Sequence, residues 1–134
     1  MIKTAEEFIR LRQSELKEDQ ERATHEPADL NVWTDVVNKY PEFKTWVIHN
    51  KTIQIEILET LAKDKDANVR YDVARKRKIN ASIFNTLSVD SDENVRHALI
   101  SNTALTIEQL KKINVANSAW LTNAVDEKIR NASR

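Results

Sequence analysis

The apolar residues of this chain recur at intervals of three and four positions, and a 26-residue pattern of them returns along the second half of the sequence. Val69 returns as Val95 and Val73 as Leu99, and many flanking positions keep the same offset. Spacings of three and four place side chains on one face of a helix, so the pattern predicts amphipathic helices. A period of this length is typical of solenoid proteins.

Weaker copies of the pattern precede and follow the two clear ones. Subtracting one period places Phe43 under Val69, and adding one places Leu121 under Val95. The repeats are therefore expected over residues 41–132, with two short helices in each unit. A single helix pair cannot bury its apolar face alone, so neighbouring pairs must stack. The predicted fold class is all-α, a short α-solenoid of about three and a half helix pairs in a single domain, residues 1–134.

Residues 1–40 lie before the repeats and are expected to form an N-terminal helical cap. A first helix is predicted over about residues 5–24, with a capping box formed by Thr4 and Glu7. Its apolar stripe is expected to contain Ala5, Phe8, Ile9 and Leu16. Pro27 suits the first turn of a second helix, and Pro41 is expected to end that helix and open the next. The buried face of this second helix is expected to contain Leu30, Trp33, Val36, Val37 and Tyr40.

The composition fits this class and narrows the chemistry. The chain has no Gly, which disfavours the tight hairpin turns of an all-β fold, and no Cys, which excludes disulfides and thiolate metal sites. The formal net charge is +0, so any preference for nucleic acid or a membrane must be local. No apolar run is long enough to span a bilayer, and the polar N-terminus lacks a signal-peptide core. The expected location is cytoplasmic, and no membrane partner is predicted.

One stretch of the repeat resembles a known family. Its residues are Leu61-Ala62-Lys63-Asp64-Lys65-Asp66-Ala67-Asn68-Val69-Arg70, followed by Val73-Ala74. This stretch resembles the bacterial leucine-rich repeat variant, a relative of HEAT repeats. The resemblance implies a right-handed superhelix of short helix pairs and fixes no activity. Gln54, Asn80 and Thr106 stand where that family favours Pro. Some members carry an iron–sulfur cluster on a cysteine-rich segment, and because this chain has no Cys, no cofactor is expected.

Acidic and basic residues recur with the repeat. Arg70 and Arg96 are 26 residues apart, and Lys44 stands one unit earlier. Asp66 and Asp92 precede the two arginines by four positions, so the spacing predicts i,i+4 ion pairs and a structural ladder between units. The alternative is a row of cations for phosphates or acidic side chains, and the sequence favours the structural role.

A basic run, Arg75 to Lys78, is the strongest charge feature. Residues 63–78 contain seven cations and three acids. Residues 49–52 and 101–104 stand at the same repeat positions, so these loops are expected to line one edge of the solenoid. Trp46 breaks the repeat, and core packing against the first helices is favoured over an exposed binding role. The candidate partner-binding residues are Trp46, His49, Asn50, Lys51, Arg75, Lys76, Arg77, Lys78 and Asn102. A purely solvated edge stays open as an alternative.

No motif of the sequence favours catalysis or metal binding. His25, His49 and His97 lack metal-ligand spacing, and without Gly no phosphate-binding loop can form. Trp33 and Trp120 are expected in the core or at the ends of the array. The sequence therefore predicts a non-enzymatic scaffold that binds another protein. The alternative is a small nucleic-acid-binding protein that uses Lys51 and the basic run, but residues 79–100 carry three acids against one Arg, so positive charge lapses there.

Overall fold

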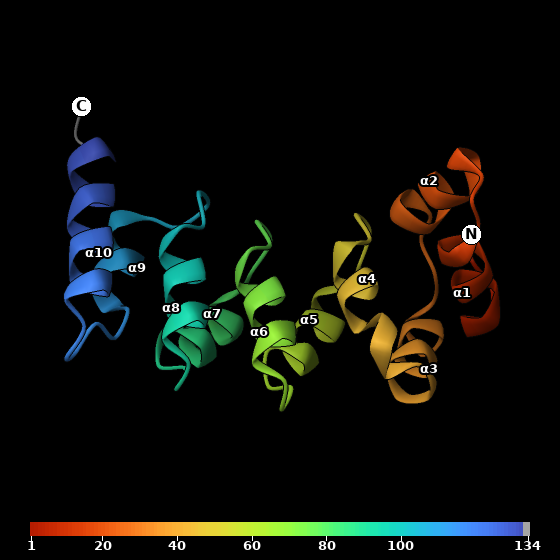
Figure 1. The fold of residues 1–134 in the computed structure, drawn as a ribbon, viewed down its shortest axis with the longest axis horizontal. Helices are drawn as coiled ribbons and strands as arrows, with labels where there is room; N and C mark the ends of the chain where they lie inside the picture. Colours follow the sequence, from red (N-terminus) through yellow and green to blue (C-terminus); the bar gives the residue numbers. More distant parts are fainter. Residues whose placement is uncertain (133–134) are drawn as a thin grey trace. The chain divides into compact units, whose positions relative to one another are not determined.

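A computed structural model describes residues 1–132 of the chain, and its helices are labelled in Figure 1. These residues form ten α-helices and one short 3₁₀-helix, and no strand occurs among them. Ile2 and Ala28 form an isolated parallel bridge of extended backbone. The all-α class predicted from the sequence is therefore confirmed. None of the described helices combines the length and the apolar character that crossing a bilayer requires.

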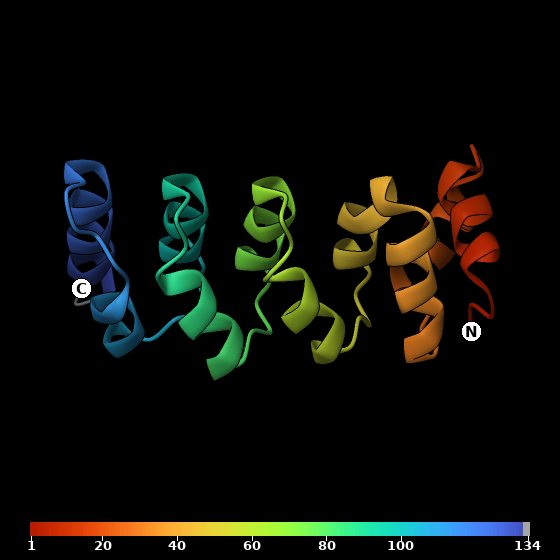
Figure 2. The ribbon, with the colours of Figure 1, turned by 90° about the horizontal axis from the view of Figure 1, so that it is seen from below.

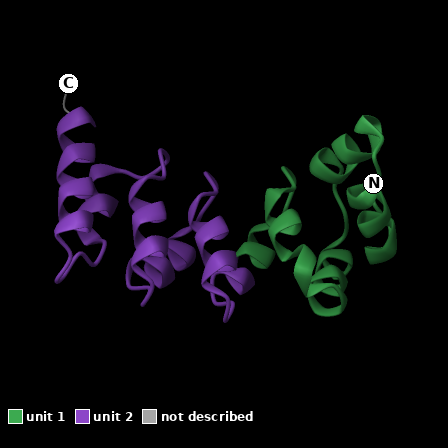
Figure 3. Ribbon diagram, in the orientation of Figure 1, with its two compact units in different colours: residues 1–58 green, residues 59–134 purple. Residues whose placement is uncertain are grey.

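The chain divides into two compact units, Met1–Leu58 and Glu59–Arg134 (Figure 3), and the division falls within α5 (Ile55–Leu61). Unit 1 contains, before the start of α5, the helices α1 (Ala5–Gln13), α2 (Lys17–His25), α3 (Leu30–Lys39), η1 (Pro41–Phe43) and α4 (Lys44–His49). Its largest fully buried side chains are Ile2, Phe8, Leu11, Trp33, Ile48 and Leu58. The rings of Phe8 and Trp33 meet edge to face with their centroids 5.1 Å apart. The assignment of residues 1–40 as a cap stays a prediction.

The single helix predicted over residues 5–24 is two helices, because the chain turns at Ser14. Ser14 ends α1 in an extended conformation, with φ −66° and ψ 145°. Its hydroxyl donates to Asp19 Oδ2 at 2.7 Å and accepts from the Leu16 amide at 3.1 Å. Such local bonds offer the backbone an alternative to continuing the helix. As a result Leu16, predicted in the apolar stripe, is 58% exposed, whereas Leu11, which the prediction omitted, is buried.

The second predicted helix begins later than the sequence suggested. α3 starts at Leu30, and Pro27 lies before it rather than in its first turn. The Pro27 carbonyl instead accepts a 2.9 Å hydrogen bond from the Ile2 amide, beside the parallel bridge. Trp33 is fully buried as predicted, but Leu30 is 40% exposed. Pro41 follows the end of α3 and opens η1, as the sequence indicated.

Unit 2 contains helix pairs whose starts carry polar caps. After α5 it forms α6 (Ala67–Ala74), α7 (Ala81–Ser88), α8 (Glu93–Ile100), α9 (Ile107–Lys112) and α10 (Ala119–Ala132). Asp66 caps α6 and Asp92 caps α8, as their positions predicted, and Asn80 caps α7. Thr106 and Gln109 form the predicted reciprocal capping box. These caps satisfy first-turn amides that have no partner within their own helix.

The capping box predicted in unit 1 is only half formed. The Thr4 hydroxyl accepts from the Glu7 amide at 3.0 Å, as predicted. The Glu7 carboxylate, however, accepts from the Lys3 amide at 2.7 Å rather than from the amide of Thr4. The reciprocal bond therefore extends one residue beyond the cap.

The repeating apolar positions form the core of unit 2. α8 packs against α6, α7 and α10, and α9 packs against α10. Within this unit, Figure 2 shows α6, α8 and α10 in one row and α7 and α9 in a second row. The buried side chains stand at matching repeat positions: Leu61, Leu87 and Ile113; Val69, Val95 and Leu121; Val73, Leu99 and Val125. The 26-residue pattern of the sequence therefore corresponds to the apolar faces that these helices bury against one another.

Candidate functional site

Arg70, in the first half of α6, binds the loop before α8. Its guanidinium binds Asp90 through two hydrogen bonds, from Nε at 2.8 Å and from Nη2 at 3.2 Å. Nη1 donates to the Asp64 carbonyl at 2.8 Å. The hydrogen bond with Asp90 raises the pKa of Arg70 above its usual value. Asp66 accepts from a backbone amide instead, so the predicted i,i+4 pair of Asp66 and Arg70 is wrong, and the ion pair connects successive helix pairs.

Arg96 stands at the equivalent position one period later but makes a different contact. Its Nη1 donates to the Asn114 carbonyl at 2.7 Å, and its Nε is buried with no hydrogen-bond partner among the described residues. Ala116 occupies the position that corresponds to Asp90, so this loop offers no carboxylate. Asp92, the predicted partner, caps α8. Arg70 therefore binds the loop before α8, and Arg96 binds the loop before α10. These contacts favour a structural role for both arginines.

The buried side chain of Asn102 connects the loops that follow the C-terminal ends of α6 and α8. Asn102 is 5% exposed. Its Nδ2 donates to the carbonyls of Ala74 at 2.9 Å and Lys76 at 2.7 Å, and its Oδ1 accepts from the Ala104 amide at 2.9 Å. One side chain thus binds the end of α6 and shapes its own loop at the same time. Within unit 2, the loops that follow α6 and α8 therefore lie side by side.

Asn50 makes the same arrangement in unit 1. It is fully buried, and its Nδ2 donates to the carbonyls of Ala23 at 2.8 Å and Glu26 at 3.0 Å. Its Oδ1 accepts from the Thr52 amide at 2.8 Å. Buried amides that satisfy main-chain carbonyls belong to the structure of the fold. Asn50 and Asn102, predicted as candidate partner-binding residues, are therefore buried groups with a structural role.

The loop that Asn102 holds carries the basic run. Arg75, Arg77 and Lys78 are exposed, and Lys76 is half-buried. The Arg75 guanidinium lies over the Tyr71 ring, 5.8 Å from its centroid. Neither Arg75 nor Arg77 pairs with a carboxylate in the part of the chain that the structure describes. These two guanidinium groups are therefore available to an anion from outside the chain.

A pocket of about 440 Å³ opens beside these arginines, between α6 and α8. It is lined by Tyr71, Arg75, Arg77, His97, Ala98, Ser101, Asn102 and Thr103. Tyr71 and His97 were not among the residues predicted to bind a partner, although their repeat positions correspond. One period separates Tyr71 from His97, and the same offset places Arg75 over Ser101. Adjacent helices therefore bring matching positions to the two sides of one pocket.

An exposed aromatic stack extends this surface to α10. The imidazole of His97 lies parallel to the Trp120 indole, with centroids 4.0 Å apart and an interplanar angle of 8°. Trp120 is 47% exposed, so of the two places that the sequence suggested for it, the core and the ends of the array, the core is excluded. Trp33, by contrast, is fully buried as predicted. Tyr71, Arg75, Arg77, His97 and Trp120 form a contiguous surface, named here the aromatic–cationic face.

Unit 1 has a smaller aromatic cluster around Trp46. The Arg12 guanidinium lies 3.8 Å from the centroid of the Trp46 ring, and His49 meets the same ring edge-on at 5.7 Å. Trp46 is 39% exposed. Its partner does come from α1, as the favoured prediction held, but the ring is not part of the core. The Lys51 amide donates to the Thr24 carbonyl at 2.7 Å, while its side chain is exposed.

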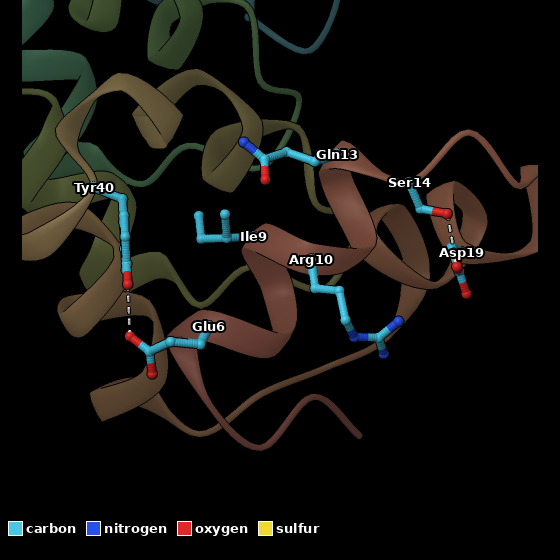
Figure 4. Close-up of a pocket in the computed structure, with 7 residues that line it drawn as sticks. All are labelled: Glu6, Ile9, Arg10, Gln13, Ser14, Asp19 and Tyr40. Carbon is cyan, nitrogen blue, oxygen red and sulfur yellow. Dashed lines mark hydrogen bonds between the residues drawn. The ribbon is translucent and has the colours of Figure 1, made fainter.

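A second pocket, of about 430 Å³, lies against α1 (Figure 4). It is lined by Glu6, Ile9, Arg10, Gln13, Ser14, Asp19 and Tyr40. The Tyr40 hydroxyl donates to Glu6 at 2.9 Å, and Ser14 donates to Asp19 at 2.7 Å. The bond to Tyr40 lowers the pKa of Glu6 and raises the pKa of Tyr40. These pairs join helices of unit 1, so the polar groups here serve the fold.

Replacing Glu6 with Gln is expected to lower the pH at which Tyr40 ionises. The Glu6 carboxylate accepts the phenol proton and repels the phenolate, so it holds the Tyr40 pKa above its ordinary value. The measurement is the tyrosinate absorbance as pH rises, with a Tyr40→Phe background subtracted from both the parent and Glu6→Gln. An unchanged Tyr40 titration would contradict the hydrogen bond shown in Figure 4.

The described residues offer no group of three or more His, Asp or Glu side chains placed to hold a metal ion. Comparison with protein-family models, curated proteins and solved structures gave no match. A function for the chain must therefore be inferred from its own geometry and charge.

Proposed function

We propose that the chain is a non-enzymatic protein-binding module, built as a short α-solenoid of HEAT-like helix pairs similar to the bacterial leucine-rich repeat variant. The observation that carries the proposal is the aromatic–cationic face of unit 2. Its side chains come from three helices that lie side by side, α6, α8 and α10, and from the loop after α6. A surface assembled from matching positions of successive helix pairs suits recognition of an extended partner.

The composition of this face is that of a protein interface rather than of an ordinary solvated surface. Aromatic residues and Arg are enriched at protein interfaces, and Trp, Tyr and Arg supply most of their binding energy. Trp120 is 47% exposed and Tyr71 is 37% exposed. Stacking on His97 fixes one face of the Trp120 indole and leaves the rest of the ring available. A ring held in this way loses little conformational entropy when a partner covers it.

The lining of the unit 2 pocket supports a binding role. It contains guanidinium, hydroxyl, amide and aromatic groups, and no carboxylate is among its lining residues. Its chemistry is that of hydrogen-bond donation and stacking.

One observation favours a second function, binding of nucleic acid. Arg75, Arg77 and Lys78 are exposed beside Tyr71, and cations next to aromatic rings can bind phosphates and stack on bases. The cations do not continue along the helix row, however, because Ser101 and Thr103 stand one period after the two arginines. A groove that tracks a nucleic-acid backbone needs positive charge sustained over several phosphates. The protein-binding proposal is therefore preferred.

A photo-crosslinking residue at position 120 is expected to form adducts with protein in intact cells. The residue p-benzoylphenylalanine would replace Trp120 in the full chain, and the same residue in place of Lys111 on α9 is the matched control. Adducts that are lost with protease and resist nuclease, and that are absent at position 111, are the expected result. The reason is that the aromatic–cationic face, unlike the surface of α9 around Lys111, carries the side chains that protein interfaces favour.

Two outcomes would contradict the proposal. Adducts at position 120 that disappear with nuclease would establish the nucleic-acid alternative. Equal adduct formation at positions 120 and 111 would show that the aromatic–cationic face has no special role in binding.

A further inference from the structure

We infer that the pocket between α6 and α8 binds an anionic side chain of a partner peptide, with the guanidinium groups of Arg75 and Arg77 as its ligands. The inference rests on the proposed protein-binding function and adds the chemistry of the partner. The anion is a carboxylate of Asp or Glu or the phosphate of a phosphorylated residue, since both present oxygens that a guanidinium binds in a bidentate manner.

The charges around the pocket favour an anion from outside the chain. Arg75 and Arg77 line the pocket, are exposed, and form no ion pair with a described carboxylate. No Asp or Glu lines the same pocket. In contrast Arg70, on the same helix pair, has its carboxylate in Asp90. Within unit 2 the fold pairs Arg70 with a carboxylate and leaves the two guanidinium groups at the pocket without one among the described side chains.

The main chain that carries the two arginines is held in place before any ligand arrives. Asn102 binds the carbonyls of Ala74 and Lys76, which flank Arg75. The Lys76 amide donates to the Val73 carbonyl at 3.0 Å, which continues the last turn of α6 into the loop. A loop fixed by these bonds loses little entropy on binding, so more of the interaction with the anion appears as affinity. Asn102 is thus a positioning residue for this pocket.

Further hydrogen-bond donors complete the site around the two guanidinium groups. His97, Ser101 and Thr103 line the pocket opposite the arginine-bearing loop. Their hydroxyl and imidazole groups can donate to oxygens of the anion that the guanidinium groups leave open. The volume, about 440 Å³, lies within the range of small-ligand sites, so the pocket is large enough to accommodate an anionic side chain.

A peptide fits the surroundings better than a nucleic acid does. Beyond the pocket, the exposed Trp120 stacks on His97 and offers apolar area to a residue that neighbours the anion. Cations do not recur at the next repeat position, where Ser101 and Thr103 stand. One anionic side chain with a nearby apolar residue matches one cationic pocket beside one exposed indole. The partner segment is therefore an acidic or phosphorylated peptide that also carries an apolar or aromatic residue.

The test uses the full chain and an array of synthetic peptides. Each peptide pool has random flanking positions and a fixed central Glu, phosphoserine, phosphotyrosine or Gln. At least one anionic pool is expected to bind about tenfold or more tightly than the Gln pool, because a guanidinium–anion contact is a charge-assisted hydrogen bond. A preference for Glu over the phosphorylated pools, or the reverse, identifies which anion the pocket takes.

The double variant Arg75→Gln/Arg77→Gln is expected to abolish this preference for the anionic pool. Its matched control, Lys111→Gln/Lys112→Gln, removes two exposed charges from α9 in the same unit and is expected to keep the preference. Circular dichroism and thermal unfolding should match the parent for both, because the replaced side chains are exposed. Trp120→Ala is expected to weaken every pool about equally.

Three results would overturn the inference. The first is equal binding of the Gln and anionic pools, and the second is an anion preference that survives in Arg75→Gln/Arg77→Gln. Either would leave the protein-binding function standing, since crosslinking at position 120 tests that separately. The third is the absence of peptide binding together with micromolar, salt-dependent binding of tRNA, single-stranded or duplex DNA that needs Arg75 and Arg77. That result would overturn the protein-binding proposal as well.

Discussion

The variant Asn102→Ala is expected to lose about 2–4 kcal/mol of the free energy of unfolding, a large share of the stability of a small protein. The Asn102 side chain is 5% exposed and satisfies two carbonyls and one amide of the main chain. Alanine would leave the carbonyls of Ala74 and Lys76 without this donor and would open a cavity the size of an amide. Unsatisfied polar groups of this kind cost far more than an average hydrogen bond contributes.

The measurement is urea unfolding of the full chain, and the variants provide their own controls. Asn94→Ala replaces an exposed Asn of α8 and is expected to stay within about 0.5 kcal/mol of the parent. Asn102→Asp keeps the shape of the side chain and the acceptor for Ala104 but places oxygens against two carbonyl oxygens. It should therefore be at least as destabilising as Asn102→Ala. A parent-like Asn102→Asp would contradict the buried arrangement of this side chain.

The parts of the fold that the sequence predicted are those that local rules decide. The 26-residue spacing of Val69, Val95 and Leu121 identified the buried positions of unit 2, because each helix has one apolar face to cover. Asp66 and Asp92 were placed correctly at helix starts, since a cap depends only on the residues that follow it. Periodicity and capping chemistry are local properties, and both survive folding unchanged.

The parts that the sequence did not predict depend on contacts between distant residues. Arg70 lies four positions after Asp66 but binds Asp90, twenty positions further on, because neighbouring helix pairs bring their loops together. Asn102 was assigned to an edge of the solenoid because its loop stands at the same repeat position as the basic run, yet its amide is buried against the end of α6. The break at Ser14 has a local cause, the hydrogen bonds of its hydroxyl. The polar residues around it are good helix formers, so the sequence did not indicate the end of a helix there.

The structure also changes how the charge of unit 2 should be considered. From the sequence, the acids of the next unit were expected to offset the positive charge of the basic run. These acids are Asp90, Asp92 and Glu93. In the fold, those acids lie at the starts of helices, whereas Arg75 and Arg77 lie past the end of α6. An eight-residue helix separates the two ends by about 12 Å, which exceeds the Debye length of about 8 Å at physiological ionic strength. The pocket is therefore locally cationic although the chain has no net charge.

Loss of the Arg70 side chain is expected to destabilise the chain by about 3 kcal/mol, far more than a surface ion pair contributes. The side chains of Arg70 and Asp90 are 15% and 6% exposed, so Arg70→Ala leaves a carboxylate in a partly dry site without its cation. Arg96→Ala is the matched control, because Arg96 donates a hydrogen bond to a carbonyl, and Ala116 stands at the repeat position of Asp90. It should cost about 1 kcal/mol.

A double-mutant cycle with Asp90→Asn separates the ion pair from lost packing. Asn at position 90 keeps an acceptor for the Asp92 amide, which donates to Asp90 at 2.9 Å, and removes the buried charge. The pair Arg70→Ala/Asp90→Asn should therefore be no less stable than Arg70→Ala alone, with a coupling energy of about 1–3 kcal/mol. Binding of the peptide pools should be unaffected, because Arg70 does not line the pocket. Additive losses in the cycle would contradict a stabilising ion pair between Arg70 and Asp90. A stable Arg70→Ala variant that binds no peptide would instead place Arg70 in the binding surface.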